Sequence, residues 1–123
     1  MDKKYIDFAC NMHGYLIRVK EIHWNTNNNS EHLLCDEIES AIHDCEDRFM
    51  EVAMGMEGEH FPIGKLLPMI PNATSLSGML NSLDKDVVEM LEKCKDKDDE
   101  GLRNALGDLH ECCKKYKYRA TQK

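Results

Sequence analysis

Apolar residues recur every three or four positions along most of this chain, which is the spacing of amphipathic helices. The first repeat predicts a helix over about residues 2–24 and consists of Tyr5, Phe8, Ala9, Met12, Tyr15, Leu16, Val19 and Ile22. A polar connector at 25–30 supplies good helix caps, and a second repeat from Leu34 to Val52 predicts a helix over about 30–56. The first half of the chain is therefore expected to be two helices joined by a short link.

The second half begins with a segment that cannot be one regular element, because glycine and proline interrupt it throughout. These residues are Gly55, Gly58, Pro62, Gly64, Pro68 and Pro71. Thr74 or Ser75 then caps a third predicted helix that reaches about residue 95, and a fourth follows the break at 96–99. We predict one all-α domain over 1–123, an up-down four-helix bundle with a long crossover between its second and third helices, which is the ferritin-like layout.

Composition narrows the functional classes. No apolar run approaches the roughly 18 to 20 residues that span a bilayer, so a cytoplasmic protein without a membrane partner is expected. The six cysteines include no C-x-x-C pair and mostly fall at apolar helix positions, which predicts reduced thiols. A net charge of -7, with one basic cluster at 114–119, argues against nucleic acid as a partner.

The second predicted helix carries the informative polar residues. At about 100° per residue, with His32 at zero, Asp36, His43, Asp47 and Glu51 fall near 40°, 20°, 60° and 100°. The apolar stripe of the same helix centres at about 220°, so the polar set faces away from its own core. Any solvated helix face shows such a pattern, and this plain interpretation stays open from spacing alone.

The spacing of the carboxylates along this helix leads to the alternative, a metal site shared between two chains. Asp36 and Asp47 are eleven residues apart, or about 16 Å along one helix, so one metal ion cannot contact both in one chain. If two copies of this helix pack antiparallel about a two-fold axis near residues 41–42, His32 and Asp36 lie opposite the Asp47 and Glu51 of the other copy. Imidazole and carboxylate ligands favour Fe(II) and other first-row divalent ions over thiolate-bound zinc.

These residues resemble the ferroxidase motif of the Dps mini-ferritins. The resemblance rests on His23-Trp24-Asn25 followed by His32, Asp36, Asp47 and Glu51, with a small residue and a glycine after the glutamate. It covers roughly residues 15–58. The nine residues from His23 to His32 are a shorter spacing than in a typical Dps, and in this the chain also resembles compact ferritin-like proteins of phage genomes.

The resemblance implies a ferroxidase that oxidises Fe(II) with peroxide or dioxygen, for iron sequestration or protection from peroxide. It implies that His23, His32 and Asp36 of one subunit and Asp47 and Glu51 of its partner are both the metal ligands and the catalytic residues. Iron is the implied metal, and zinc is a substitute that the same ligands would accept. The implied assembly is a homo-oligomer with a two-fold dimer as minimal unit, which in the family closes into a dodecameric cage.

A non-catalytic alternative remains: a ferritin-like helical interaction or virion-associated protein, with or without zinc. Trp24 is expected to pack under the corner between the first two helices, and His43 to be an interface residue near the two-fold axis. No role is assigned to His13, His60 or His110, because lone histidines are more often structural or solvated.

Overall fold

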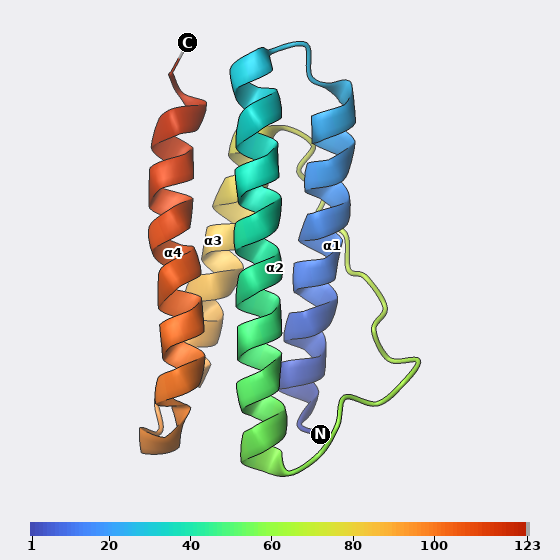
Figure 1. Ribbon diagram of the computed structural model, residues 1–123, viewed down its shortest axis with the longest axis vertical. Coiled ribbons are helices and arrows are strands. Elements are labelled where there is room, and N and C mark those ends of the chain that lie inside the picture. The colour runs from blue at the N-terminus through green and yellow to red at the C-terminus, as the bar shows by residue number, and fades with distance from the viewer. Residues whose placement is uncertain (123) are drawn as a thin grey trace.

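Four helices account for most of the chain in the computed structural model, which describes residues 1–122 (Figure 1). They are α1 (Lys3–Asn25), α2 (Asn29–Glu57), α3 (Leu76–Lys93) and α4 (Glu100–Ala120), with a single 3-10 turn at Lys97–Asp99 before α4. No strand occurs in this described part of the chain. The all-α, four-helix prediction is confirmed, and the ends of the first three helices lie within two residues of those expected.

Polar side chains fix where the helices begin. Asp2 accepts a hydrogen bond from the Lys4 amide, Asn28 from the Glu31 amide and Ser75 from the Gly78 amide, so each cap satisfies an amide that has no partner inside its helix. At the other end of α2, Gly58 adopts φ 65°, a left-handed conformation that glycine enters without steric cost.

Each pair of helices in extensive contact runs antiparallel, and α1 packs on α2, α2 on α4, and α4 on α3 (Figure 1). The link over residues 58–75 leaves the end of α2 and returns along the outside of α1, so that α2 and α3 run in the same direction (Figure 1). Two hydrogen bonds hold the link there: the Met69 amide donates to the Cys10 carbonyl at 3.0 Å, and the Arg18 side chain donates to the Pro71 carbonyl at 2.9 Å.

The core is a single cluster that receives side chains from all four helices. Its largest fully buried members are Tyr15, Phe49, Met12, Ile38, Ile42, Met79, Leu80, Leu83, Leu102 and Leu106. Residues predicted to form the apolar stripe of the second helix, such as Ile38 and Phe49, are fully buried, so the polar face of α2 does point outward. All six cysteines are unpaired thiols.

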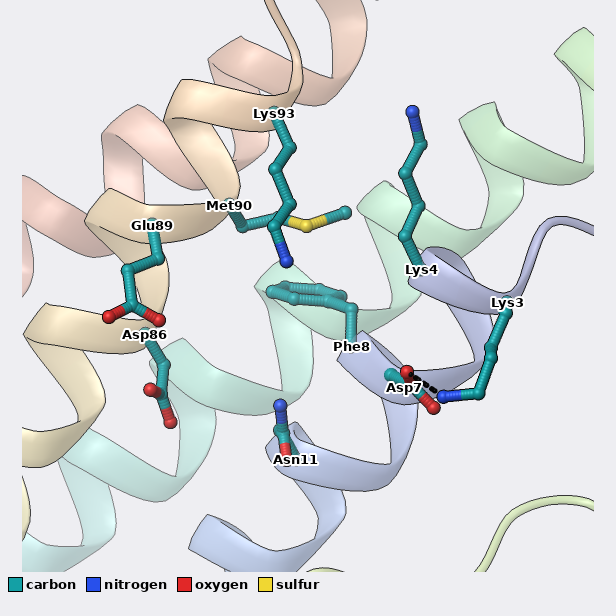
Figure 2. Close-up of a pocket in the computed structure, with 9 residues that line it drawn as sticks. All are labelled: Lys3, Lys4, Asp7, Phe8, Asn11, Asp86, Glu89, Met90 and Lys93. Carbon is teal, nitrogen blue, oxygen red and sulfur yellow. Dashed lines mark hydrogen bonds and ion pairs between the residues drawn. The ribbon is translucent and has the colours of Figure 1, made fainter.

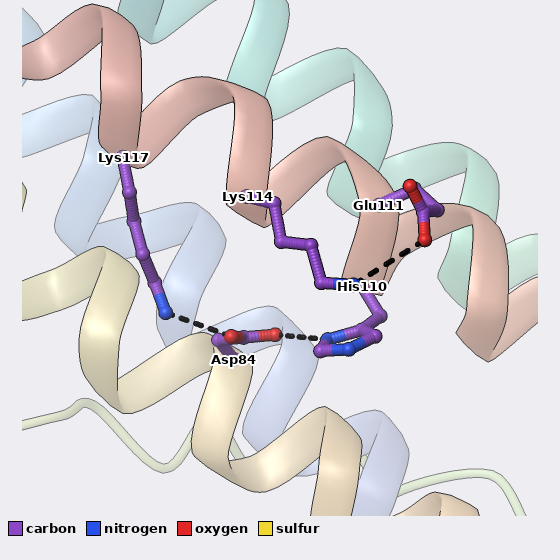
Figure 3. Close-up of polar contacts among 5 residues, drawn as sticks. All are labelled: Asp84, His110, Glu111, Lys114 and Lys117. Atoms are coloured by element: carbon purple, nitrogen blue, oxygen red, sulfur yellow. Dashed lines mark hydrogen bonds and ion pairs between the residues drawn. The ribbon is translucent and has the colours of Figure 1, made fainter.

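A buried carboxylate joins the two C-terminal helices (Figure 3). Asp84 of α3 is 2.6 Å from Nδ1 of His110 and 2.7 Å from Nζ of Lys117, both on α4. Burial by itself raises the pKa of Asp84, but the hydrogen bonds from Lys117 and His110 outweigh it and leave the pKa below its ordinary value of 3.8. The ion pair therefore fixes how α3 and α4 face each other.

Within residues 1–122 no helix has both the length and the apolar character needed to cross a bilayer.

Candidate metal centre

Two of the predicted ligands meet at the corner between α1 and α2. His23 lies in the last turn of α1 and His32 in the first turn of α2, and a link of only three residues, 26–28, separates the helices. The Nε2 atoms of the two rings are 3.0 Å apart, and the rings meet edge to face with centroids 4.0 Å apart. The short link therefore determines the distance between the two imidazoles.

Asp36 lies one turn after His32 and approaches the other side of the His23 ring. Its Oδ1 atom is 3.5 Å from His23 Nδ1, which is too long for a strong hydrogen bond. His23 Nδ1 is buried, and among the described residues it has no hydrogen-bond partner. A buried polar atom without a partner is uncommon in a folded protein. Here the nearby carboxylate lies at a separation that two ligand atoms of one metal ion can have.

A residue that the sequence interpretation missed completes this group. His23, Asp36 and Glu39 each offer one ligand atom, and these three atoms lie within 4.8 Å of one another. Glu39 also pairs with Lys20 of α1, whose Nζ is 3.0 Å from Glu39 Oε2. The signal was available, because Glu39 follows Asp36 by three positions and so shares its helix face. Glu39 is not part of the motif on which the resemblance rests. Its ion pair with Lys20 depends on how α1 packs against α2.

The two remaining predicted ligands lie elsewhere on α2. Asp47 and Glu51 are exposed, and Asp47 pairs with His43 on the same helix, with Nδ1 and Oδ2 3.9 Å apart. The structure of one chain thus brings His23, His32 and Asp36 together and leaves the second pair of carboxylates further along the same exposed helix face. This separation is what the eleven-residue spacing requires.

Two neighbouring depressions lie over this face, between α1 and α2. One, of about 540 Å³, is lined by Lys20, Asp36, Glu39, Ser40 and His43. The other, of about 520 Å³, adds the apolar side chains Leu16, Ile17 and Trp24.

Trp24 is 74% exposed, so the prediction that it packs under the corner is wrong. Its ring lines the outer depression between α1 and α2 instead, because its position on α1 turns it away from the core.

Other polar groups of the bundle fit structural roles. His13 binds the buried Glu46 at 2.8 Å, and His110 binds Asp84, so each histidine is half-buried and paired with a carboxylate. A cleft of about 190 Å³ where the start of α1 meets the end of α3 contains lysines and carboxylates in equal number around Phe8 and Met90 (Figure 2). Lys3 and Asp7 pair there at 2.6 Å, so this cleft presents balanced charge and no converging ligand set.

The distance between the two imidazoles is compatible with a single metal ion. Two metal–nitrogen bonds of about 2.1 Å that end on atoms 3.0 Å apart enclose an angle of about 90° at the metal. Such an angle suits an octahedral ion that keeps open positions for further carboxylates, water or an oxidant. Without a metal, the same distance is a hydrogen bond from one neutral imidazole to the other.

The fold and this cluster define a class: a small all-α four-helix protein with histidines and carboxylates gathered at one corner of the bundle. Residues 23–120 match a family described as "Family of unknown function (DUF5856)", and because the match spans most of the chain, the protein belongs to that family. The matched region starts at His23 and includes all five predicted ligands and Glu39. No curated protein and no solved structure matches the chain.

Proposed function

We propose that this protein is a ferritin-like iron-binding protein that oxidises Fe(II) to Fe(III) at a site formed between two subunits. The observation that carries the proposal is the convergence of His23, His32 and Asp36 at one corner, where the two imidazole Nε2 atoms are 3.0 Å apart and Asp36 Oδ1 is 3.5 Å from the His23 ring. The long link that makes α2 and α3 run the same way supports the ferritin-like assignment.

The second half of the site comes from a partner in this proposal. Asp47 and Glu51 are exposed on the same side of α2 as Asp36, about 16 Å and more along the helix. An antiparallel two-fold contact between two α2 helices would set the partner's pair beside each histidine corner and create two identical sites. At the level of the axis Ile42 faces its own core, so Ser40 and His43 would meet the partner.

The chemistry of the ligands matches the proposed reaction. Each Fe(II) gives up one electron, and one peroxide takes two electrons and two protons to become two water molecules. Carboxylates stabilise the more highly charged Fe(III) product, while the imidazoles hold the metal without adding charge. His23, His32 and Asp36 bind the ion in this proposal, and the partner's Asp47 and Glu51 complete the charge that Fe(III) requires.

Assembly beyond the dimer is a separate part of the proposal. The two-fold dimer is the minimal unit that contains a complete site, and closure into a dodecameric cage would add storage of iron as mineral. Sedimentation velocity separates the two, because a chain of 14.2 kDa gives a dimer and a dodecamer that differ sixfold in mass. The acidic surface, with a net charge of -7, is unfavourable for a DNA-condensing role.

The experiment is an anaerobic Fe(II) titration followed by addition of peroxide, with the oligomeric state of every variant matched. We expect wild type to bind Fe(II) saturably and to oxidise it fast, and both Asp36→Ala and Asp47→Ala to lose this activity. Glu92→Ala is the control, because it removes the same charge from an exposed position on α3. Activity that is absent in wild type, or that persists in both aspartate variants, would contradict the proposal. If a parallel titration shows that Zn(II) binds while no Fe(II) is oxidised, the result would instead support the non-catalytic zinc protein.

A further inference from the structure

The Nδ1 side of the His23 ring forms a second group of ligand atoms. His32 approaches the opposite ring nitrogen, Nε2, whereas Asp36 Oδ1 lies 3.5 Å from Nδ1. Glu39 belongs to the same group of ligand atoms as His23 and Asp36. Nδ1 itself is buried and, within residues 1–122, accepts and donates no hydrogen bond. One atom from each of the three residues lies within 4.8 Å of the other two.

These separations are close to those of ligands around one ion. With metal–ligand bonds of about 2.0 to 2.2 Å, two ligand atoms on one ion lie at most about 4.4 Å apart. The group at His23 would therefore need to contract by less than about 1 Å. Asp36 is 61% exposed, so its carboxylate can make this adjustment by rotating in water, without disturbing the core.

A cation already lies beside this group. Lys20 Nζ is 3.0 Å from Glu39 Oε2 and neutralises one of the two carboxylates. The Lys20 side chain is 38% exposed, so it can leave Glu39 and remain hydrated. A divalent ion would compete with it directly, because both are attracted by the same carboxylate.

We propose that His23 Nδ1, Asp36 and Glu39 form a divalent-metal position that is complete within one chain, and that the Lys20 ammonium is the counter-cation that a metal displaces. Nitrogen and carboxylate ligands of this kind suit Zn(II), Mn(II), Fe(II) and Co(II). The position requires neither a partner subunit nor an oxidation step, so it does not depend on the proposed ferroxidase function.

The position also affects the tautomer of His23. A neutral imidazole has one nitrogen free to bind a metal and carries a proton on the other. When Nδ1 binds the ion, Nε2 keeps its proton and donates to His32 Nε2 across the 3.0 Å contact. A metal held between the two Nε2 atoms requires the opposite tautomer, so the two positions compete for the same ring.

The test uses the double variant Asp47→Ala/Glu51→Ala, which lacks the carboxylates of the shared site, with Zn(II) alone as the probe in calorimetric titrations. We expect one ion per chain, with affinity reduced at least about tenfold by Glu39→Gln in this background. Lys20→Met should raise the affinity by about two- to fivefold, because it removes a partly exposed competing ion pair. Glu92→Gln, on α3, should leave the affinity unchanged.

Nitrogen-15 NMR of the histidine rings identifies the nitrogen that binds the metal. We expect Zn(II) to shift the His23 Nδ1 resonance while Nε2 retains its proton. No binding in the double variant, indifference to Glu39→Gln, or binding through Nε2 would each overturn the inference. A protein that binds Zn(II) in this way but oxidises no Fe(II) would uphold it and contradict the proposed function, so the two failures can be distinguished.

Discussion

Gly14→Ala tests how the long link is held against α1. A Cβ atom at Gly14 would overlap the Met69 carbonyl group and lie 2.9 Å from the Ile70 nitrogen, and both are backbone atoms that no side-chain rotation can move. The link would have to shift outward and would strain the bond from the Met69 amide to the Cys10 carbonyl. Overpacking of this kind costs about 1 to 3 kcal/mol, and losing the hydrogen bond costs about 1 kcal/mol more.

The same substitution has an opposite effect that must be subtracted. Alanine favours the helical state over glycine by about 1 kcal/mol, so the net loss expected for Gly14→Ala is about 1 to 3 kcal/mol in the free energy of unfolding. Gly107→Ala is the control, because a Cβ atom there meets nothing within 4 Å in the middle of α4, and it should gain about 0.5 to 1 kcal/mol. Urea unfolding measures both. Equal stabilisation by the two substitutions would refute the close approach of the link to α1.

Two further predictions concern buried charge and thiols. Asp84→Asn should lower the free energy of unfolding at pH 7 by about 1 to 3 kcal/mol, because Lys117 and His110 lose their shared partner. The pKa of Asp84 is depressed in the folded state, so its contribution to the free energy of unfolding is complete above pH 3.8 and is lost as the pH falls through the lower folded pKa. Acid unfolding curves of wild type and variant should converge at that pH. Burial raises the pKa of the Cys113 thiol to about 12, so a thiol reagent should modify the half-buried Cys112 first and Cys113 only on unfolding; equal rates would contradict the packing of α4.

The helices could be predicted because their signals are local. Apolar spacing and the capping residues Asn28 and Ser75 placed the starts of α2 and α3 within a residue or two. The convergence of His32 and Asp36 on one helix face also follows from a fixed helical repeat. The contact of His23 with both follows from a link too short to allow many arrangements.

What could not be predicted depends on packing between helices. Lys20 meets Glu39, and His13 meets Glu46, because α1 and α2 lie antiparallel in one particular register, and no single helix contains that information. The exposure of Trp24 has the same origin, since a residue at the end of α1 can turn toward the corner or away from it. The partners of Asp47 and Glu51 depend on a second chain, so they remain predictions.

The most direct test of the shared site is complementation between two defective chains. Asp36→Ala and Asp47→Ala variants, each inactive alone, are unfolded, mixed in equal amounts and refolded, and Fe(II) oxidation by peroxide is then measured. In a mixed dimer one site has both defects, but the other combines an intact histidine corner with an intact Asp47 from the partner. We expect about one quarter of wild-type activity, because half of the dimers are mixed and each mixed dimer contains one working site out of two. Recovery of no activity, with mixed dimers shown to be present, would contradict a site shared between subunits.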